Sequence, residues 1–208
     1  MIVGMDEVGR WPLAWPVTVA VVLCLPAFFR TSPEWYDRVT DSKKVSPWQR
    51  EYLARCILDH PHIVSGIASS PASMIDSKGI VYAIRHAAMK SLDSLIDQLH
   101  SKKISLKYIH IVLDGKTDYG LRGVLPYPLE TVIRGDQSVW QIGAASIIAK
   151  VQRDEWMTKL STKKKYRPYD FARHKGYGTL MHREAILSSG LSDQHRKSFC
   201  QRILWETT

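Results

Sequence analysis

Four acidic residues stand beside apolar segments of the chain. Asp6 and Glu7 follow a short apolar run near the N-terminus, Asp114 ends a second run, and Asp154 lies downstream of a third. Carboxylates at the ends of buried strands tend to converge, because neighbouring strands finish at one edge of a sheet, and open α/β sheets bind ligands at that edge. We therefore expect these four side chains to form one site.

Carboxylates gathered in one place repel one another, and their pKa values rise unless a cation compensates. The usual compensation is a hard divalent ion with oxygen ligands, here Mg²⁺ or Mn²⁺. Two such ions about 3.5–4 Å apart activate a water molecule and stabilise a leaving oxygen, which is the chemistry of phosphodiester cleavage. The sequence therefore predicts a two-metal nuclease site.

Each carboxylate also has an ordinary structural interpretation. Asp114 precedes Gly115 and fits a turn, and Asp154 fits a surface ion pair with Lys150 four residues earlier. Asp6 and Glu7 fit the solvated end of a strand. Adjacent strand residues point to opposite faces, so these two share a site only if the strand ends or bulges there.

The charge of the chain favours a polyanionic partner. There are 29 Lys and Arg against 20 Asp and Glu, a net charge of +9. Residues 151–208 alone hold 12 Lys and Arg against 6 Asp and Glu. Nucleic acid is the partner that this balance suggests, and a solvated basic face is the alternative.

The composition excludes several classes of protein. A chain of 208 residues that is 45% hydrophobic can form one large globular domain. Three distant cysteines (Cys24, Cys56 and Cys200) fit neither a disulfide framework nor a zinc site, which indicates a reducing compartment. Because the sequence shows no membrane span and no signal peptide, we expect a cytoplasmic protein, by default a monomer.

Strand patterns come first, alternate with helical patterns, and give way to a helical tail. Strands are predicted at 2–5, 17–25, 63–68, 108–113 and 130–133, and helices at 47–59, 80–99, 138–160, 182–187 and 194–204. This order indicates an α/β fold. We divide the chain into a sheet domain, residues 1–160, and a basic helical extension packed on it, residues 161–208.

Longer motifs resemble the type 2 ribonuclease H family, ribonuclease HII, in the family's order and over nearly the whole chain. They are GMDEVGR at 4–10, DSKK at 41–44, VLDG at 112–115, GAASIIAKV at 143–151, HKGYGT at 174–179, HREA at 182–185 and HRKSF at 195–199. One such motif is weak evidence, whereas this many in order are highly specific. The resemblance implies an RNase H-like fold, with a mixed sheet flanked by helices and a C-terminal helical appendage.

The resemblance also implies an activity. It is divalent-metal-dependent cleavage of RNA in RNA–DNA hybrids, including single ribonucleotides embedded in duplex DNA, which leaves 5′-phosphate and 3′-hydroxyl ends and serves replication and repair. The acidic quartet of the family would fall on Asp6, Glu7, Asp114 and Asp154, as both catalytic residues and metal ligands.

Further family motifs imply contacts with the nucleic acid. A Gly-Arg-Gly loop, here Gly9, Arg10 and Trp11, would read the ribose 2′-hydroxyl at the RNA–DNA junction, the group that distinguishes RNA from DNA. Tyr177 would stack at the junction sugar, and Lys43 would lie near the nucleic-acid backbone.

The sequence departs from the family at two glycines. Trp11 replaces the last residue of the Gly-Arg-Gly loop, and Trp15 stands where the family motif has a second glycine. One hypothesis is that UGA codons read as glycine in the cell are written here as tryptophan, and UGG codons at both positions would refute it. The competing hypothesis is a true variant with altered or lost junction specificity.

Two alternatives to the nuclease remain. The first is a non-catalytic nucleic-acid-binding relative, in which Trp11 blocks the junction loop. The second is a structural module whose acidic residues only cap strands, and widely scattered carboxylates would favour it.

Overall fold

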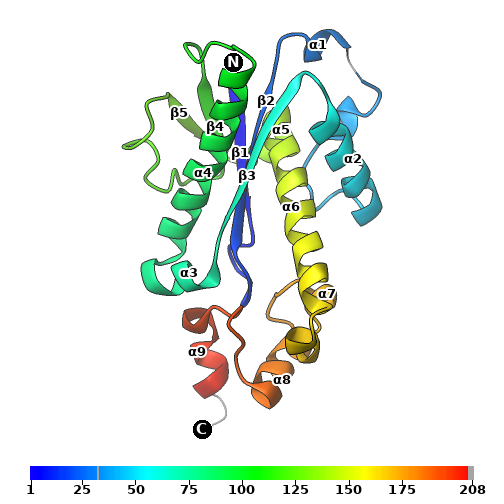
Figure 1. Cartoon of the computed structure of the whole chain (residues 1–208), viewed down its shortest axis with the longest axis vertical. Coiled ribbons are helices and arrows are strands. Elements are labelled where there is room, and N and C mark those ends of the chain that lie inside the picture. Colours follow the sequence, from blue (N-terminus) through cyan, green and yellow to red (C-terminus); the bar gives the residue numbers. More distant parts are fainter. Residues whose placement is uncertain (32, 206–208) are drawn as a thin grey trace.

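A five-stranded mixed sheet forms the centre of the computed structural model, which describes residues 1–31 and 33–205 (Figure 1). The strand order is β3-β2-β1-β4-β5. The pairs β3–β2 and β2–β1 are antiparallel, whereas β1–β4 and β4–β5 are parallel. The strands are β1 (Ile2–Val8), β2 (Val17–Cys24), β3 (Ile63–Ser70), β4 (His110–Asp114) and β5 (Leu129–Val132).

Helices cover both faces of this sheet. Helices α3 and α4 lie on one face, α2 and α6 lie on the other, and α7 to α9 lie beyond the end of the sheet (Figure 1). The helical segments are α1 (Phe28–Thr31), η1 (Tyr36–Arg38), α2 (Pro47–Asp59), α3 (Ala72–Lys78), α4 (Ile80–Ser101), α5 (Gly135–Ser138), α6 (Trp140–Ser161), η2 (Lys164–Tyr169), α7 (Phe171–His174), α8 (Leu180–Ser189) and α9 (Lys197–Trp205). The predicted α/β class with a mixed sheet is confirmed.

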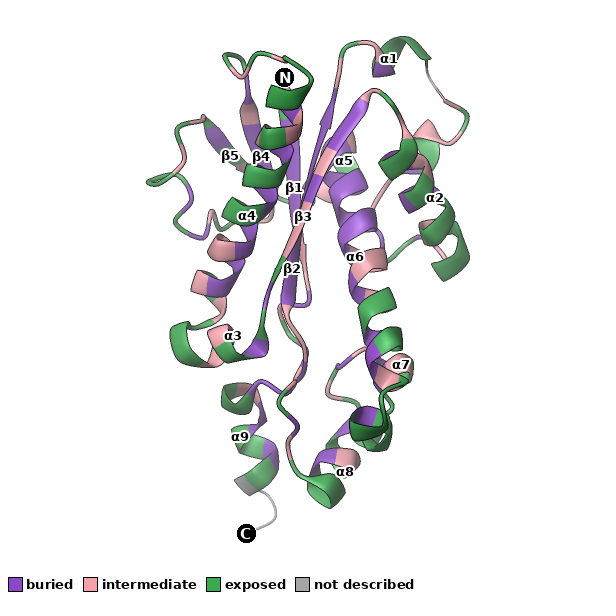
Figure 2. Cartoon of the chain, in the orientation of Figure 1, coloured by how far each residue is buried: buried purple, intermediate pink, exposed green. Residues whose placement is uncertain are grey.

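Two apolar layers hold the sheet between its helices. Every residue of β2 is buried, as expected for a β-branched run in a central strand covered on both faces (Figure 2). Alternate residues of the sheet pack on α4, which presents small and aliphatic side chains such as Ala87 and Leu95, and the intervening residues pack on α2 and α6. The outer sides of the helices are exposed (Figure 2).

Helix α6 lies directly against β1 because Gly4 has no side chain. A Cβ atom at Gly4 would come within 2.2 Å of the backbone carbon of Gln141. The close approach brings Ser146 of α6 next to Asp6 and brings Arg153 next to Gly9. The helix thus carries polar side chains to the end of the strand that bears the first two carboxylates.

The predicted element types agree with the structure, and the main difference lies in β1. We expected it to end at residue 5, but it continues to Val8 because β2 pairs with it that far, through the Val8–Thr18 pair. The helix predicted from residue 47 begins at Pro47, and the Ser46 backbone N–H donates to Gln49 Oε1 at 3.3 Å. The short helix α3 was not predicted, since seven residues give too short a pattern.

The C-terminal segment packs on the sheet domain through the loop of residues 9–16. The backbone N–H of Leu13 donates to Gly176 O at 2.8 Å, and that of Trp15 donates to Gln194 O at 2.7 Å. The N–H of Arg196 returns a bond to Leu13 O at 2.8 Å. The boundary at residue 160 stays a prediction, and residues 206–208 lie outside the described part of the chain.

Candidate active site

The edge formed by β1 and β4 brings the first carboxylates together. The two strands are in parallel register from Ile2–His110 to Met5–Leu113, so the next residues along, Asp6 and Asp114, are neighbours. Asp6 lies on the α6 side of the sheet, where Ser146 hydrogen-bonds to it. Glu7 lies on the α4 side, where Tyr119 donates to it, because successive side chains of a strand alternate.

Asp6 and Glu7 were expected to share a site only where their strand ended or bulged, and the strand neither ends nor bulges at these two residues. The β1–β2 pairing runs without interruption through Asp6–Ala20, Glu7–Val19 and Val8–Thr18. It is β4 that ends, at Asp114, so the β4 side of β1 is open from Glu7 onward. Side chains from both faces of β1 can therefore reach the same open edge.

Burial and mutual repulsion set the electrostatics of this edge. Burial raises the pKa of Asp6 well above its ordinary value, and the negative charges of Glu7 and Asp114 add to the effect. Burial also raises the pKa of Glu7, while the hydrogen bond from Tyr119 lowers it. Both carboxyls would gain from a nearby cation, because a positive charge favours their ionised form.

Glu7 has one oxygen with a hydrogen-bond donor and one without. The hydroxyl of Tyr119 donates to Glu7 Oε1 at 2.9 Å, and the same hydroxyl accepts from Arg10 Nη1 at 3.2 Å. Oε2 of Glu7 is buried and has no hydrogen-bond partner among the described residues. A buried carboxylate oxygen without a donor is costly, and a metal ion would satisfy it.

A fourth carboxylate, Asp136, lies beside Asp114 and was missed in the sequence. The backbone N–H groups of Gly135 and Asp136 both point to Asp114 Oδ1, at 2.7 and 3.4 Å. Burial raises the pKa of Asp136, the negative charges of Asp114 and Asp41 raise it further, and Lys43 lowers it. Asp136 follows β5 closely, so the rule that placed the other carboxylates at strand ends could have found it.

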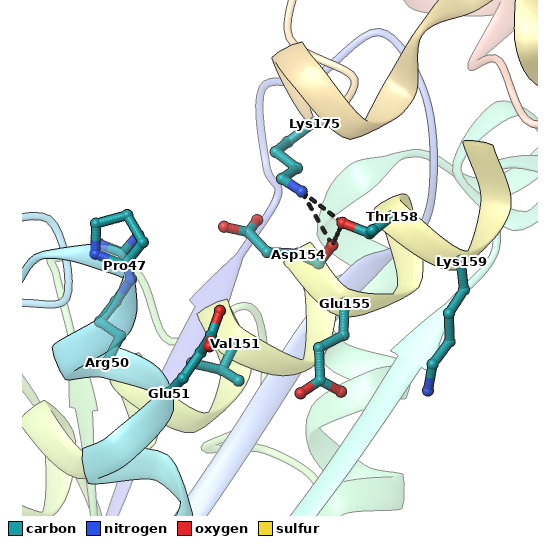
Figure 3. Close-up of a pocket in the computed structure, with 9 residues that line it drawn as sticks. All are labelled: Pro47, Arg50, Glu51, Val151, Asp154, Glu155, Thr158, Lys159 and Lys175. Carbon is teal, nitrogen blue, oxygen red and sulfur yellow. Dashed lines mark hydrogen bonds between the residues drawn. The ribbon is translucent and has the colours of Figure 1, made fainter. Parts of the chain in front are cut away.

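Asp154 has different neighbours. Its Oδ1 lies 2.7 Å from Lys150 Nζ and 3.8 Å from Arg153 Nη1. Lys175 Nζ donates to the backbone carbonyl of Asp154 at 3.3 Å and to Thr158 Oγ1 at 2.7 Å (Figure 3). The structure thus brings Asp6, Glu7 and Asp114 together with Asp136, and places Asp154 among cations in a pocket between α2 and α6.

The chemistry of the carboxylate group fits a hard divalent ion. The donors are carboxylate oxygens, which Mg²⁺ and Mn²⁺ prefer, and the unpartnered Glu7 Oε2 and the raised pKa values favour a cation. Within residues 1–31 and 33–205, however, no three His, Cys, Asp or Glu side chains are already arranged around one point.

Two buried arginines lie against the loop that follows β1, and one of them, Arg196, is hydrogen-bonded to it. Arg196 is fully buried and donates to the carbonyls of Gly9, Arg10 and Trp15 at 2.5, 3.0 and 2.9 Å. Burial, followed by the charge of Arg153, lowers the pKa of Arg196 to about 9. Arg153 lies under Gly9, whose φ is +87° and whose Cβ, if present, would come within 2.6 Å of Arg153 Nε. No sequence pattern predicted that either arginine is buried.

The two unexpected tryptophans have different surroundings. Trp11 is 73% exposed, and the guanidinium of Arg10 lies 5.0 Å from its ring centroid. Trp15 has a φ of +84°, in the range of the neighbouring Gly9. Positive φ is rare for a bulky residue and unstrained for glycine, so position 15 has a glycine-like backbone whereas position 11 does not.

Tyr177 and Lys43 lie on different sides of the site. Tyr177 is 39% exposed, and its ring centroid lies 5.5 Å from the guanidinium carbon of Arg153, which in turn lies close to Gly9 in the loop after β1. Lys43 is exposed, and its charge acts on Asp136. The predicted nucleic-acid residues thus flank the carboxylates from the loop side and from the Asp136 side.

Three buried histidines lie next to the backbone of Tyr177. His182 Nδ1 bonds to Tyr177 O at 2.9 Å, and the Nε2 atoms of His182 and His195 lie 3.0 Å apart. Since Ser192 N–H donates to His195 Nδ1 at 2.9 Å, His195 carries its proton on Nε2 and donates to His182. His174 stacks on His182 at 4.1 Å. Burial lowers the pKa of all three rings and so favours their neutral forms.

Comparison with known proteins assigns the family. The family described as Ribonuclease HII matches residues 3–208. The chain is also 36% identical to ribonuclease HII of Dehalococcoides mccartyi over 199 residues, which cover 96% of this chain and 85% of the relative. The chain belongs to the ribonuclease HII family. It is therefore an endoribonuclease, a hydrolase with ribonuclease H activity.

Solved structures confirm the fold of the chain. Ribonuclease H2 from Pyrococcus horikoshii superposes with a TM-score of 0.71 at 22% identity, covering 99% of this chain and 97% of that one. Bst-RNase HIII in complex with Mn²⁺ superposes with a TM-score of 0.69 at 16% identity, covering 100% of this chain and 70% of that one. The expected RNase H-like architecture is thus confirmed. Among the residues described, no helix is long and apolar enough to cross a membrane.

Proposed function

We propose that this member of the ribonuclease HII family uses divalent metal ions, Mg²⁺ or Mn²⁺, to cleave the RNA strand of RNA–DNA hybrids and to cut at single ribonucleotides embedded in duplex DNA. The observation that carries the proposal is the carboxylate edge around Asp6, Glu7 and Asp114, where a buried oxygen of Glu7 has no hydrogen-bond donor within the described part of the chain. The Mn²⁺ complex of Bst-RNase HIII, which shares the fold, agrees with it.

Asp6, Glu7 and Asp114 would hold the ions, together with a fourth carboxylate. What supports Asp136 in this role is its contact with Asp114 through backbone N–H groups and the repulsion between the two charges. Asp154, the residue expected from the sequence, is the competing candidate, and its ion pair with Lys150 weighs against it. When bound, the ions would activate water and stabilise negative charge at the phosphate.

The junction loop would recognise the ribonucleotide through its backbone. Arg196 occupies the carbonyls of Gly9 and Arg10, whereas the N–H groups of Arg10 and Trp11 have no acceptor among the described residues. Free N–H groups on a fixed backbone can donate to a 2′-hydroxyl, the group that identifies RNA. Tyr177 would support the junction sugar, and Lys43 would neutralise a phosphate.

A cleavage assay tests the proposal. The substrates are a duplex DNA with one ribonucleotide, an RNA–DNA hybrid, and an all-DNA duplex, each with Mg²⁺, Mn²⁺ or EDTA. We expect metal-dependent cutting of the first two and none of the third. Asp114→Asn should lower the rate at least about 100-fold, because the loss of a metal ligand removes several kcal/mol of transition-state stabilisation.

Asp136→Asn and Asp154→Asn, compared in the same assay, distinguish the two fourth ligands. We expect the first to match Asp114→Asn and the second to keep most of the activity. The reverse order would restore Asp154 to the site. Tight binding of the ribonucleotide duplex without cutting under any metal condition would contradict the proposal and favour a non-catalytic relative in which Trp11 blocks the loop.

A further inference from the structure

Tyr119 connects Glu7 of the carboxylate edge to Arg10 of the loop after β1, although it lies more than 100 residues from both of these residues in the sequence. Its side chain is 3% exposed and packs in the apolar layer between the sheet and α4. Its hydroxyl lies 2.9 Å from Glu7 Oε1 and 3.2 Å from Arg10 Nη1. The Arg10 guanidinium carbon lies 5.6 Å from the centroid of the tyrosine ring.

We propose that Tyr119 is a positioning residue that orients Glu7 for metal binding and couples this carboxylate to Arg10. The inference rests on the proposed function, because it assumes that Glu7 is a metal ligand. Tyr119 itself would touch neither the metal nor the substrate. It would act through the two residues that its hydroxyl joins.

The direction of the hydrogen bonds supports this role. The guanidinium of Arg10 can only donate, so the Tyr119 oxygen accepts from it. The hydroxyl has one proton, which must then go to Glu7, because a carboxylate only accepts. The series of hydrogen bonds therefore runs from Arg10 through Tyr119 to Glu7 Oε1. It leaves the buried Oε2 of Glu7 as the oxygen that would bind the ion.

The burial of Tyr119 makes this orientation rigid. The ring is held in a close-packed layer, so the hydroxyl cannot follow Glu7 if that side chain turns away. Hydrogen bonds that orient a metal ligand contribute strongly, and their loss costs about 10–100-fold in metal affinity or activity. A change in the position of Arg10, which belongs to the junction loop, would also reach Glu7 through the same hydroxyl.

Tyr119→Phe removes the hydroxyl and keeps the ring. We expect its affinity for Mn²⁺, measured by titration calorimetry without nucleic acid, to fall about 10–100-fold. The matched control is Tyr169→Phe, another buried tyrosine whose hydroxyl donates to Gly190 O at 2.9 Å, far from the carboxylates in the described chain. The control should lose comparable stability, followed by thermal denaturation, and keep its Mn²⁺ affinity.

A Glu7→Gln background shows whether Tyr119 acts through Glu7. In that background, Tyr119→Phe should cause no further loss of Mn²⁺ affinity, because the carboxylate that Tyr119 orients is no longer present. Arg10→Gln alters the same series of hydrogen bonds at its more exposed end and does not disturb the core. It should weaken Mn²⁺ binding less than Tyr119→Phe does. With saturating Mn²⁺, Tyr119→Phe should still raise KM for the ribonucleotide duplex, since Arg10 has lost its anchor.

The outcomes separate the inference from the function on which it rests. A wild-type protein that binds no Mn²⁺ contradicts both. A wild-type protein that binds Mn²⁺ and cleaves, with a folded Tyr119→Phe variant of equal Mn²⁺ affinity, overturns the role of Tyr119 alone. If Tyr119→Phe does not fold, an Arg10→Gln variant with unchanged Mn²⁺ affinity and KM overturns it instead.

Discussion

At Trp15 the backbone has a φ of +84°, a conformation that is strained for a residue with a Cβ and free for glycine. The surroundings enforce it, because Trp15 N–H donates to Gln194 O and Trp15 O accepts from the buried Arg196. Replacing Trp15 by glycine and, separately, by alanine removes the indole in both variants. The difference between the two variants therefore reports the backbone alone.

The expected difference is about 1 kcal/mol in favour of glycine. A left-handed conformation costs an L-residue about 1–2 kcal/mol, and glycine loses about 0.4–1 kcal/mol through the larger entropy of its unfolded chain. Trp11 is the matched control, because its φ is not positive and its side chain is exposed. There the sign should reverse, with Trp11→Ala more stable than Trp11→Gly by about 0.4–1 kcal/mol.

Thermal and urea denaturation of the four variants measure both differences. For a chain of this length, 1 kcal/mol corresponds to about 2–4 °C in Tm. Comparison with wild type is less informative, because Trp15→Gly also loses the contact with Trp156, whose ring centroid lies 6.1 Å away. If Trp15→Ala is as stable as Trp15→Gly, or if both positions give the same sign, the strain at Trp15 is refuted.

The stability difference at position 15 also relates to the hypothesis that the codons for residues 11 and 15 are read as glycine. A glycine-like backbone at position 15 is what the hypothesis of UGA read as glycine requires there, whereas the conformation of Trp11 is open to any residue. UGG codons at 11 and 15 would refute recoding and leave a true variant that carries strain beside its junction loop. Sequencing the gene and the purified protein decides between them.

Three further predictions concern the loop, the tail and the substrate. Arg196→Met should lower the free energy of unfolding by about 2–4 kcal/mol, because three loop carbonyls lose their donor. It should also raise KM for the ribonucleotide duplex and leave the Mn²⁺ affinity unchanged, and an unaltered KM would contradict the proposed role of the loop. Burial lowers the pKa of both His182 and His195 to about 4, below the value near 6.5 in the unfolded chain. Between these two pH values the unfolded chain binds more protons than the folded one, so Tm should fall as the pH drops from about 6.5 towards 4. A Tm that rises over this range would refute the assignment of neutral buried histidines. Binding of the ribonucleotide duplex to Asp114→Asn protein should weaken steeply with salt, and Lys43→Ala should reduce the slope of log K against log salt by about 1; an equal slope would show that Lys43 contacts no phosphate.

Local patterns predicted the sheet and the main helices because they act over a few residues. The β-branched run of β2 and the helix start at Ser46 and Pro47 each specify an element without knowledge of the rest. The end of β1 was predicted wrongly for the same reason. The charges of Asp6 and Glu7 suggested a strand end, whereas pairing with β2, a partner outside the local window, extends the strand to Val8.

The site was only partly predictable, because its chemistry depends on burial and on contacts distant in sequence. Asp6, Glu7 and Asp114 were found by their place after apolar runs, and their proposed role as metal ligands stays a prediction. Tyr119 lies in a segment without periodicity, and its meeting with Glu7 spans 112 residues. No sequence pattern distinguishes Arg153 and Arg196 from surface arginines, and only the structure shows that both are buried.

Protein cations lie close to some of the acidic residues and not to others, and this determines which carboxylates are available to a metal ion. The guanidinium of Arg196 donates to carbonyls of the loop after β1, and that of Arg153 donates to Lys175 O, so neither forms an ion pair with the carboxylate edge. Asp154, by contrast, already has Lys150 at 2.7 Å. A carboxylate with a close protein cation gains less from a metal ion than carboxylates that repel each other. The edge of Asp6, Glu7 and Asp114, extended by Asp136, is therefore where a divalent ion gains most, and its affinity should fall when any of these charges is removed.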